Sequence, residues 1–153
     1  MDRYKEQYER IIRWYKKFEI LNQGTLHDKD SNYYIDEIYA FFINCYHLKD
    51  WIKNDSQINT DVSDIETFIR NSQNLSICAD ICNGLKHLKL NHPKIDPDTT
   101  FGGKHFKVGL GTQPTTIALN IEIISNGVTY DAFNLATDCI KEWKNYLISK
   151  NML

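Results

Sequence analysis

The amino-acid sequence predicts a mainly α-helical protein, a bundle of four to five helices with a small β-hairpin before the last helix. Over most of the chain, apolar residues recur at three- and four-residue steps, which is the spacing of an amphipathic helix. The stretch 116–130 instead carries β-branched residues on both sides of Asn126-Gly127, a pair that readily adopts the positive φ of a hairpin turn. All 153 residues are expected to form one domain, since single cores commonly serve about 100–200 residues.

The expected helices are separated by turn and capping residues. Gly24 ends the first helix, the S-x-x-E spacing of Ser63 and Glu66 predicts a capping box for the third, and Asp131 caps the last. Prolines and glycines between 93 and 114 exclude a helix there, and a third strand is expected over 104–110. The helix ranges are 2–22, 32–53, 64–70, 73–90 and 132–149.

Composition restricts the function classes. A net charge of −2 argues against nucleic-acid binding driven by whole-protein charge, although it leaves room for a local site. No apolar run approaches the roughly 20 residues of a membrane span, so no membrane association is expected. The start, MDRYKEQYER, lacks the apolar region of a signal peptide, and a cytoplasmic protein is expected.

The four cysteines agree with a reducing compartment. Cys45, Cys78, Cys82 and Cys139 include no C-x-x-C pair, so they are interpreted as small buried side chains, with a metal or disulfide role as the alternative. Neither a metal nor a cofactor is expected.

Candidate catalytic residues lie on one stripe of the expected helix 73–90. Asp80, Asn83 and His87, at i, i+3 and i+7, can form a hydrogen-bonded line that fixes the tautomer of the histidine, as general acid–base chemistry requires. Lys86 flanks the stripe as a cation, and Ser76 begins it. The alternative is that these side chains form a solvated face.

Candidate binding residues lie on the expected helix 32–53. Asn44, His47 and Trp51 share one side of it, and antiparallel packing of the two helices would bring His47 toward His87. Gly84, inside a helix, predicts the close approach of another helix, either within the bundle or across a dimer interface, with a loose loop as the alternative.

The segment Cys82-Asn83-Gly84-Leu85-Lys86-His87 resembles a degenerate HEPN-domain motif, in which an arginine is followed by a polar residue, three to five further residues and a histidine. HEPN domains are small, often dimeric helical bundles of prokaryotic RNases, toxin–antitoxin pairs and antiviral systems. The resemblance implies a homodimer in which His87 assists attack of a ribose 2′-OH on the adjacent phosphate without metal, supported by Asn83. Cys82 stands where the motif has its arginine.

Two functions therefore follow as hypotheses. The first is a non-catalytic HEPN-like module that binds or regulates a protein partner in a defence or stress system, in line with the missing arginine and a strand edge that can pair with another chain. The second is a metal-independent HEPN-type RNase that uses His87 on RNA.

Overall fold

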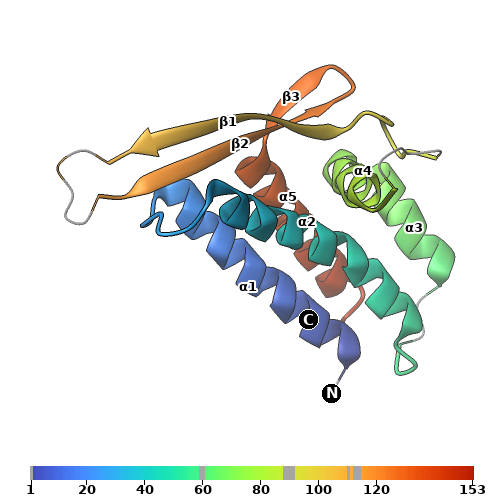
Figure 1. Ribbon diagram of the computed structural model, residues 1–153. Helices are drawn as coiled ribbons and strands as arrows, with labels where there is room; N and C mark the ends of the chain where they lie inside the picture. The colour runs from blue at the N-terminus through green and yellow to red at the C-terminus, as the bar shows by residue number, and fades with distance from the viewer. Residues whose placement is uncertain (1, 59–60, 88–91, 110, 112–114) are drawn as a thin grey trace.

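The computed structural model has the mainly α architecture that the sequence predicts, with a three-stranded antiparallel sheet laid across one end of a helical bundle (Figure 1). It describes residues 2–58, 61–87, 92–109, 111 and 115–153, the side chains of Val62 and His87 excepted. The elements of this described part are α1 (Arg3–Gln23), α2 (Ser31–Asn54), α3 (Val62–Asn71), α4 (Gln73–His87), β1 (Thr100–Val108), β2 (Ile117–Ser125), β3 (Val128–Asp131) and α5 (Ala132–Ser149).

Most helix ends follow the expected capping chemistry. Gly24 closes α1 with φ of 119°, and the Asp131 carboxylate accepts a hydrogen bond from the backbone of Asn134 at the start of α5. The capping box predicted for α3 is wrong. Asp61 caps that helix by accepting from the Ser63 N–H, which leaves the Glu66 side chain free for tertiary ion pairs.

The sheet has the strand order β1-β2-β3. Asn126 and Gly127 form the predicted turn between β2 and β3 with φ of 50° and 72°. The expected third strand is present as β1, but it begins earlier, at Thr100, and the predicted end at Leu110 lies outside the described residues. The β1–β2 register shifts between Phe101 and Lys104, as in a β-bulge, and beyond it both strands run out past the helices (Figure 1).

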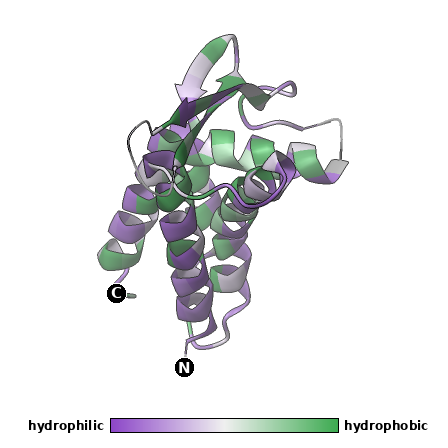
Figure 2. Cartoon of the chain, turned by 60° about the vertical axis from the view of Figure 1, so that its left-hand side comes forward, coloured by the Kyte–Doolittle hydropathy of each residue, from purple (hydrophilic) through white to green (hydrophobic). Residues whose placement is uncertain are grey.

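The sheet contributes to the core and is not an appendage. Alternate residues of β2, namely Leu119, Ile121 and Ile123, are buried against the helices. The helices show a hydrophobic and a hydrophilic side, as amphipathic helices do (Figure 2). Phe18 of α1 packs edge-on against Phe133 of α5 with ring centroids 5.3 Å apart. No helix among the described residues combines the length and apolar character needed to cross a bilayer.

Candidate functional site

One candidate residue of α2, His47, lies against α4. His47 Nε2 lies 3.8 Å from the Sγ of Cys82. The charges of Lys49, Asp50 and Lys86 also act on this thiol. We call these five residues the α2–α4 seam. The structure thus places His47 against α4, with Cys82 as its neighbour. The predicted approach of His47 to His87 stays a prediction, because the side chain of His87 lies outside the described part of the structure.

Cys82 is a neutral thiol within the seam. Burial raises its pKa to about 11, with the carboxylate of Asp50 acting in the same direction, while Lys49 and Lys86 oppose the shift. A thiol with this pKa carries little thiolate at neutral pH, so it is a poor nucleophile. The position that the HEPN motif gives to an arginine therefore supplies neither a cation nor a reactive sulfur here.

Asp80 is not part of an open acid–base line. Its side chain has no exposed surface, and its carboxylate accepts hydrogen bonds from the backbone N–H groups of Lys94 at 2.6 Å, Ile95 at 2.8 Å and Asp96 at 3.1 Å. Ser76 is likewise buried and donates to the carbonyl of Ile69. The expectation of a continuous polar stripe is therefore wrong at these two positions, because the segment after α4 folds back over Asp80.

The remaining motif residues lie toward the end of α4. Asn83 is half-buried and Lys86 is exposed. His87 is the last residue of α4, and its side chain lies outside the described part of the structure, so its predicted catalytic role stays a prediction.

The predicted set on α2 is divided between two neighbours. Asn44 faces α1, where its carbonyl and side-chain oxygens accept from the buried amide of Gln7. Trp51 also faces α1, with the guanidinium of Arg10 5.2 Å from its ring centroid. His47 instead approaches α4. Asn44 and Trp51 therefore stabilise helix packing and do not share a site with His47.

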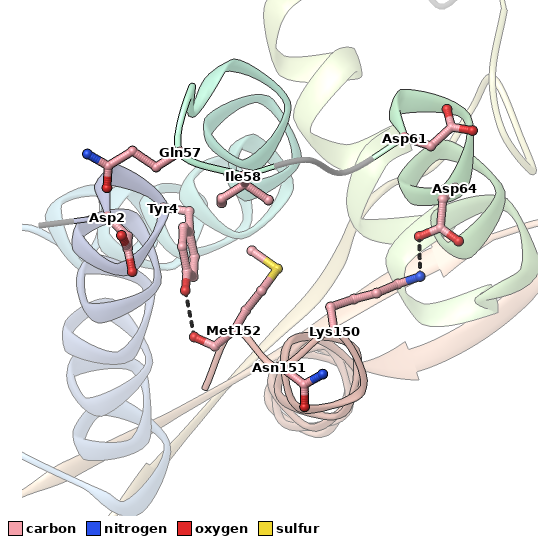
Figure 3. Close-up of a pocket in the computed structure, with 9 residues that line it drawn as sticks. All are labelled: Asp2, Tyr4, Gln57, Ile58, Asp61, Asp64, Lys150, Asn151 and Met152. Carbon is pink, nitrogen blue, oxygen red and sulfur yellow. Dashed lines mark hydrogen bonds and ion pairs between the residues drawn. The ribbon is translucent and has the colours of Figure 1, made fainter.

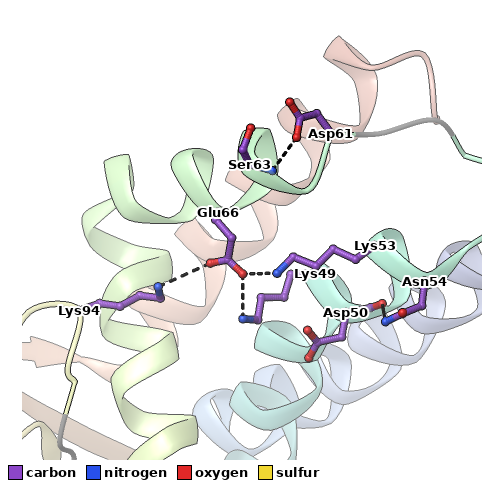
Figure 4. Close-up of polar contacts among 8 residues, drawn as sticks. All are labelled: Lys49, Asp50, Lys53, Asn54, Asp61, Ser63, Glu66 and Lys94. Carbon is purple, nitrogen blue, oxygen red and sulfur yellow. Dashed lines mark hydrogen bonds and ion pairs between the residues drawn. The ribbon is translucent and has the colours of Figure 1, made fainter.

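A lysine cluster adjoins the seam (Figure 4). The carboxylate of Glu66 on α3 pairs with Lys49 and Lys53 of α2, and with Lys94 after α4. Burial raises the pKa of Glu66, but the hydrogen bond from Lys53 and the charge of Lys49 outweigh it and hold that pKa at about 2. One carboxylate does not neutralise three lysines, so this face carries a local excess of positive charge.

Gly84 faces a pocket and not another helix. A Cβ atom at this position would meet the carbonyl oxygen of Thr99 at 3.9 Å, an ordinary contact distance. The predicted helix approach at Gly84 is therefore wrong within the described chain. The pocket there, of about 300 Å³, is lined by Tyr39, Ile81, Gly84, Leu85 and residues 97–101.

A larger pocket, of about 530 Å³, lies near both chain termini and away from the sheet (Figures 1 and 3). Several of its polar side chains already have structural partners. Tyr4 donates to the carbonyl of Met152 at 2.6 Å, and Asp64 pairs with Lys150 at 2.9 Å. Asp61 caps α3. The acidic lining makes this pocket unsuited to phosphate or other anions.

No family model matches the chain, and comparison with curated proteins and with solved structures finds no match either. Functional inference therefore rests on the chemistry of the seam, the lysine cluster and the sheet.

The seam and the lysine cluster can attract anionic groups, but their described side chains assemble no acid–base pair beside a reactive nucleophile. None of the four arginines of the chain lies on α2 or α4. The lysine cluster was not predicted from the sequence, because the spacing of Ser63 and Glu66 assigned Glu66 to a capping box. The i, i+4 spacing of Lys49 and Lys53 was the available signal, since it puts two cations on one side of α2.

Proposed function

We propose that this chain is a non-catalytic, HEPN-like helical module that binds a protein partner and regulates it in a prokaryotic defence or stress system. The free edge of β1 carries this proposal. Within the described residues, β2 pairs with β1 on one side, and with Thr25 and β3 on the other, so the outer edge of β1 has no strand beside it.

The backbone pattern identifies which groups face that edge. The Gly109 N–H donates to the Thr116 carbonyl, which makes this a hydrogen-bonded pair of the antiparallel ladder. Because such pairs alternate with non-hydrogen-bonded ones, the N–H and C=O groups of Lys104, Phe106 and Val108 point away from β2. These groups offer the main-chain hydrogen bonds by which an added strand binds a sheet edge.

The side chains of β1 favour an acidic partner strand with apolar anchors. Phe106 and Val108 are each about half exposed, at 49% and 50%. Lys104 and Lys107 are also exposed and would pair with carboxylates, while they discourage pairing between two copies of β1 by like-charge repulsion. The burial of Asp80 and the absence of an arginine from the motif support a role without catalysis.

A single proline tests this mode of binding. Val108→Pro removes one N–H that faces the free edge, a change that edge strands tolerate, whereas Val108→Thr keeps the N–H and serves as the matched control. Affinity purification from the native host is expected to recover one partner with the parent and the threonine variant and to lose it with the proline variant. Equal recovery by both variants would contradict edge pairing, and the absence of any partner would contradict a binding module.

A HEPN-type RNase is the second candidate, favoured by the approach of His47 and Lys86 to one thiol beside a lysine cluster. Purified protein would then cleave total RNA or tRNA in the presence of EDTA, and both His87→Ala and Lys86→Ala would slow cleavage. A parent protein that leaves RNA intact, or a His87→Ala variant that cleaves equally well, excludes this candidate.

A further inference from the structure

Three cysteine side chains from three different helices meet inside the bundle. Cys45 of α2, Cys78 of α4 and Cys139 of α5 have no exposed surface, and their Sγ atoms all lie within 4.8 Å of one another. An ion equidistant from three thiolates at about 2.3 Å, the zinc–sulfur distance, would hold the sulfurs about 4.0 Å apart. The three sulfurs would therefore have to move together by up to about 0.8 Å to surround an ion in their plane, and somewhat more for a pyramidal ion such as arsenic(III).

The polar groups around this cluster are few. Cys78 donates its S–H to the carbonyl of Phe42 at 3.4 Å. The indole N–H of Trp143 is buried and has no hydrogen-bond acceptor among the described residues. A buried donor of this kind is costly unless it faces a negative atom, and a sulfur ligand would provide one.

Charge balance selects the kind of ion. Three thiolates with a monovalent or divalent ion leave a net negative charge in the core, which is costly without a cation nearby. The outside charge acting on Cys45 and Cys139 is the carboxylate of Glu142, which adds to that cost. The complex of a trivalent ion with three thiolates carries no net charge. Among soft, thiophilic ions, a trivalent one is therefore the least costly to bury in this apolar interior.

We propose that Cys45, Cys78 and Cys139 form a three-thiolate site for a trivalent thiophilic ion, for which arsenite is the probe. Arsenous acid, As(OH)3, reacts with the three thiols to give As(SR)3 and three water molecules. Three As–O and three S–H bonds break, three As–S and three O–H bonds form, and no atom changes its oxidation state. The competing interpretation is that the thiols only fill the core as small apolar side chains.

Because the sulfurs are fully buried, the ion reaches them through local opening of the bundle, and binding is slow. Incubation of the folded protein with arsenite is expected to give a species that carries one arsenic atom in place of three hydrogens by native mass spectrometry. Arsenic X-ray absorption would show three sulfur neighbours, and Tm would rise because the ion binds the folded state.

Variants separate the site from incidental thiol chemistry. Cys82→Ser removes a cysteine of α4 outside the cluster and is expected to bind arsenic like the parent, whereas Cys78→Ala is expected to lose the three-sulfur signature. The parent measurements decide the question even if Cys78→Ala fails to fold. Folded parent protein without bound arsenic, arsenic held by two sulfurs, or tighter binding of Cu(I) or Zn(II) than of arsenite would each overturn the proposal.

Discussion

The Asp80 carboxylate accepts a hydrogen bond from the backbone N–H of Ile95 at 2.8 Å, and this contact fastens the segment after α4 to the interior of the bundle. Lys94 and Asp96 donate to the same carboxylate. A residue predicted to belong to the catalytic stripe thus organises the loop that follows its own helix.

Asp80→Ala is therefore expected to destabilise the fold strongly. Three backbone donors lose a charged acceptor, and the loss of unfolding free energy is expected to be about 3–5 kcal/mol by urea titration. Asp36→Asn, an exposed change on α2, is the control and should stay within about 0.5 kcal/mol of the parent. A loss below about 1 kcal/mol for Asp80→Ala would show that the loop is held by other contacts.

Protonation of Glu66 at acid pH is expected to lower the free energy of unfolding. Its pKa is about 2 in the folded protein and is expected near 4.5 in the unfolded chain, so its contribution is present above pH 4.5 and disappears as pH falls toward 2. Glu66→Gln is expected to cost about 1–2 kcal/mol at pH 7, a value reduced for solvent screening, since about a quarter of the side chain, 26%, is exposed.

The check is the free energy of unfolding of parent and variant between pH 7 and pH 3. The gap between the two proteins should narrow steadily below pH 4.5. Glu9→Gln, at an exposed position on α1, should show no such trend. A gap that stays constant with pH would mean that the lysines do not stabilise the ionised carboxylate.

Tyr4 ties the two ends of the described chain together. Its hydroxyl donates to the carbonyl of Met152 in a buried hydrogen bond of 2.6 Å. Tyr4→Phe keeps the ring and is expected to cost about 1 kcal/mol, because the carbonyl is left without this donor. Hydrogen exchange should accelerate at the Met152 amide, which donates to Leu147. The exposed Tyr33→Phe is the control, and equal exchange in both variants would contradict this role.

A substitution at Gly127 is expected to change backbone strain without creating a steric clash. It has φ of 72° in the turn between β2 and β3, and a Cβ there would meet no atom within 4 Å. Gly127→Ala is expected to lower the unfolding free energy by roughly 1–2 kcal/mol through φ strain alone. Both variants are measured by thermal unfolding. Asn126→Gly, at φ of 50°, should change the unfolding free energy very little. A neutral Gly127→Ala would mean that the turn relaxes to another type.

Local sequence rules predicted the elements well, because helix periodicity, the Asn126-Gly127 turn and the Asp131 cap depend on neighbouring residues. They failed where distant segments meet. Helical spacing placed Asp80 on a polar stripe, but the returning loop buries it. Glu66 fits a capping box by spacing, but three lysines from other segments compete for its carboxylate.

The candidate site shows the same division. The sequence predicted that His47 lies toward His87, and the structure shows His47 beside Cys82, more than one turn earlier on α4. It grouped Asn44 and Trp51 with His47 because α2 alone cannot reveal that α1 occupies that side. The convergence of Cys45, Cys78 and Cys139 depends on how three helices pack, and no spacing rule encodes it.

The packing of Phe18 against Phe133 has a consequence for the chain during its synthesis. At roughly 5–20 residues per second, a ribosome needs on the order of ten seconds to proceed from one phenylalanine to the other. For much of that interval α2 is the main element that can cover the apolar stripe of α1, because β2 and α5 are synthesised later. The nascent chain therefore exposes an apolar surface that chaperones can bind. Packing of the core is complete only when the last helix has left the exit tunnel.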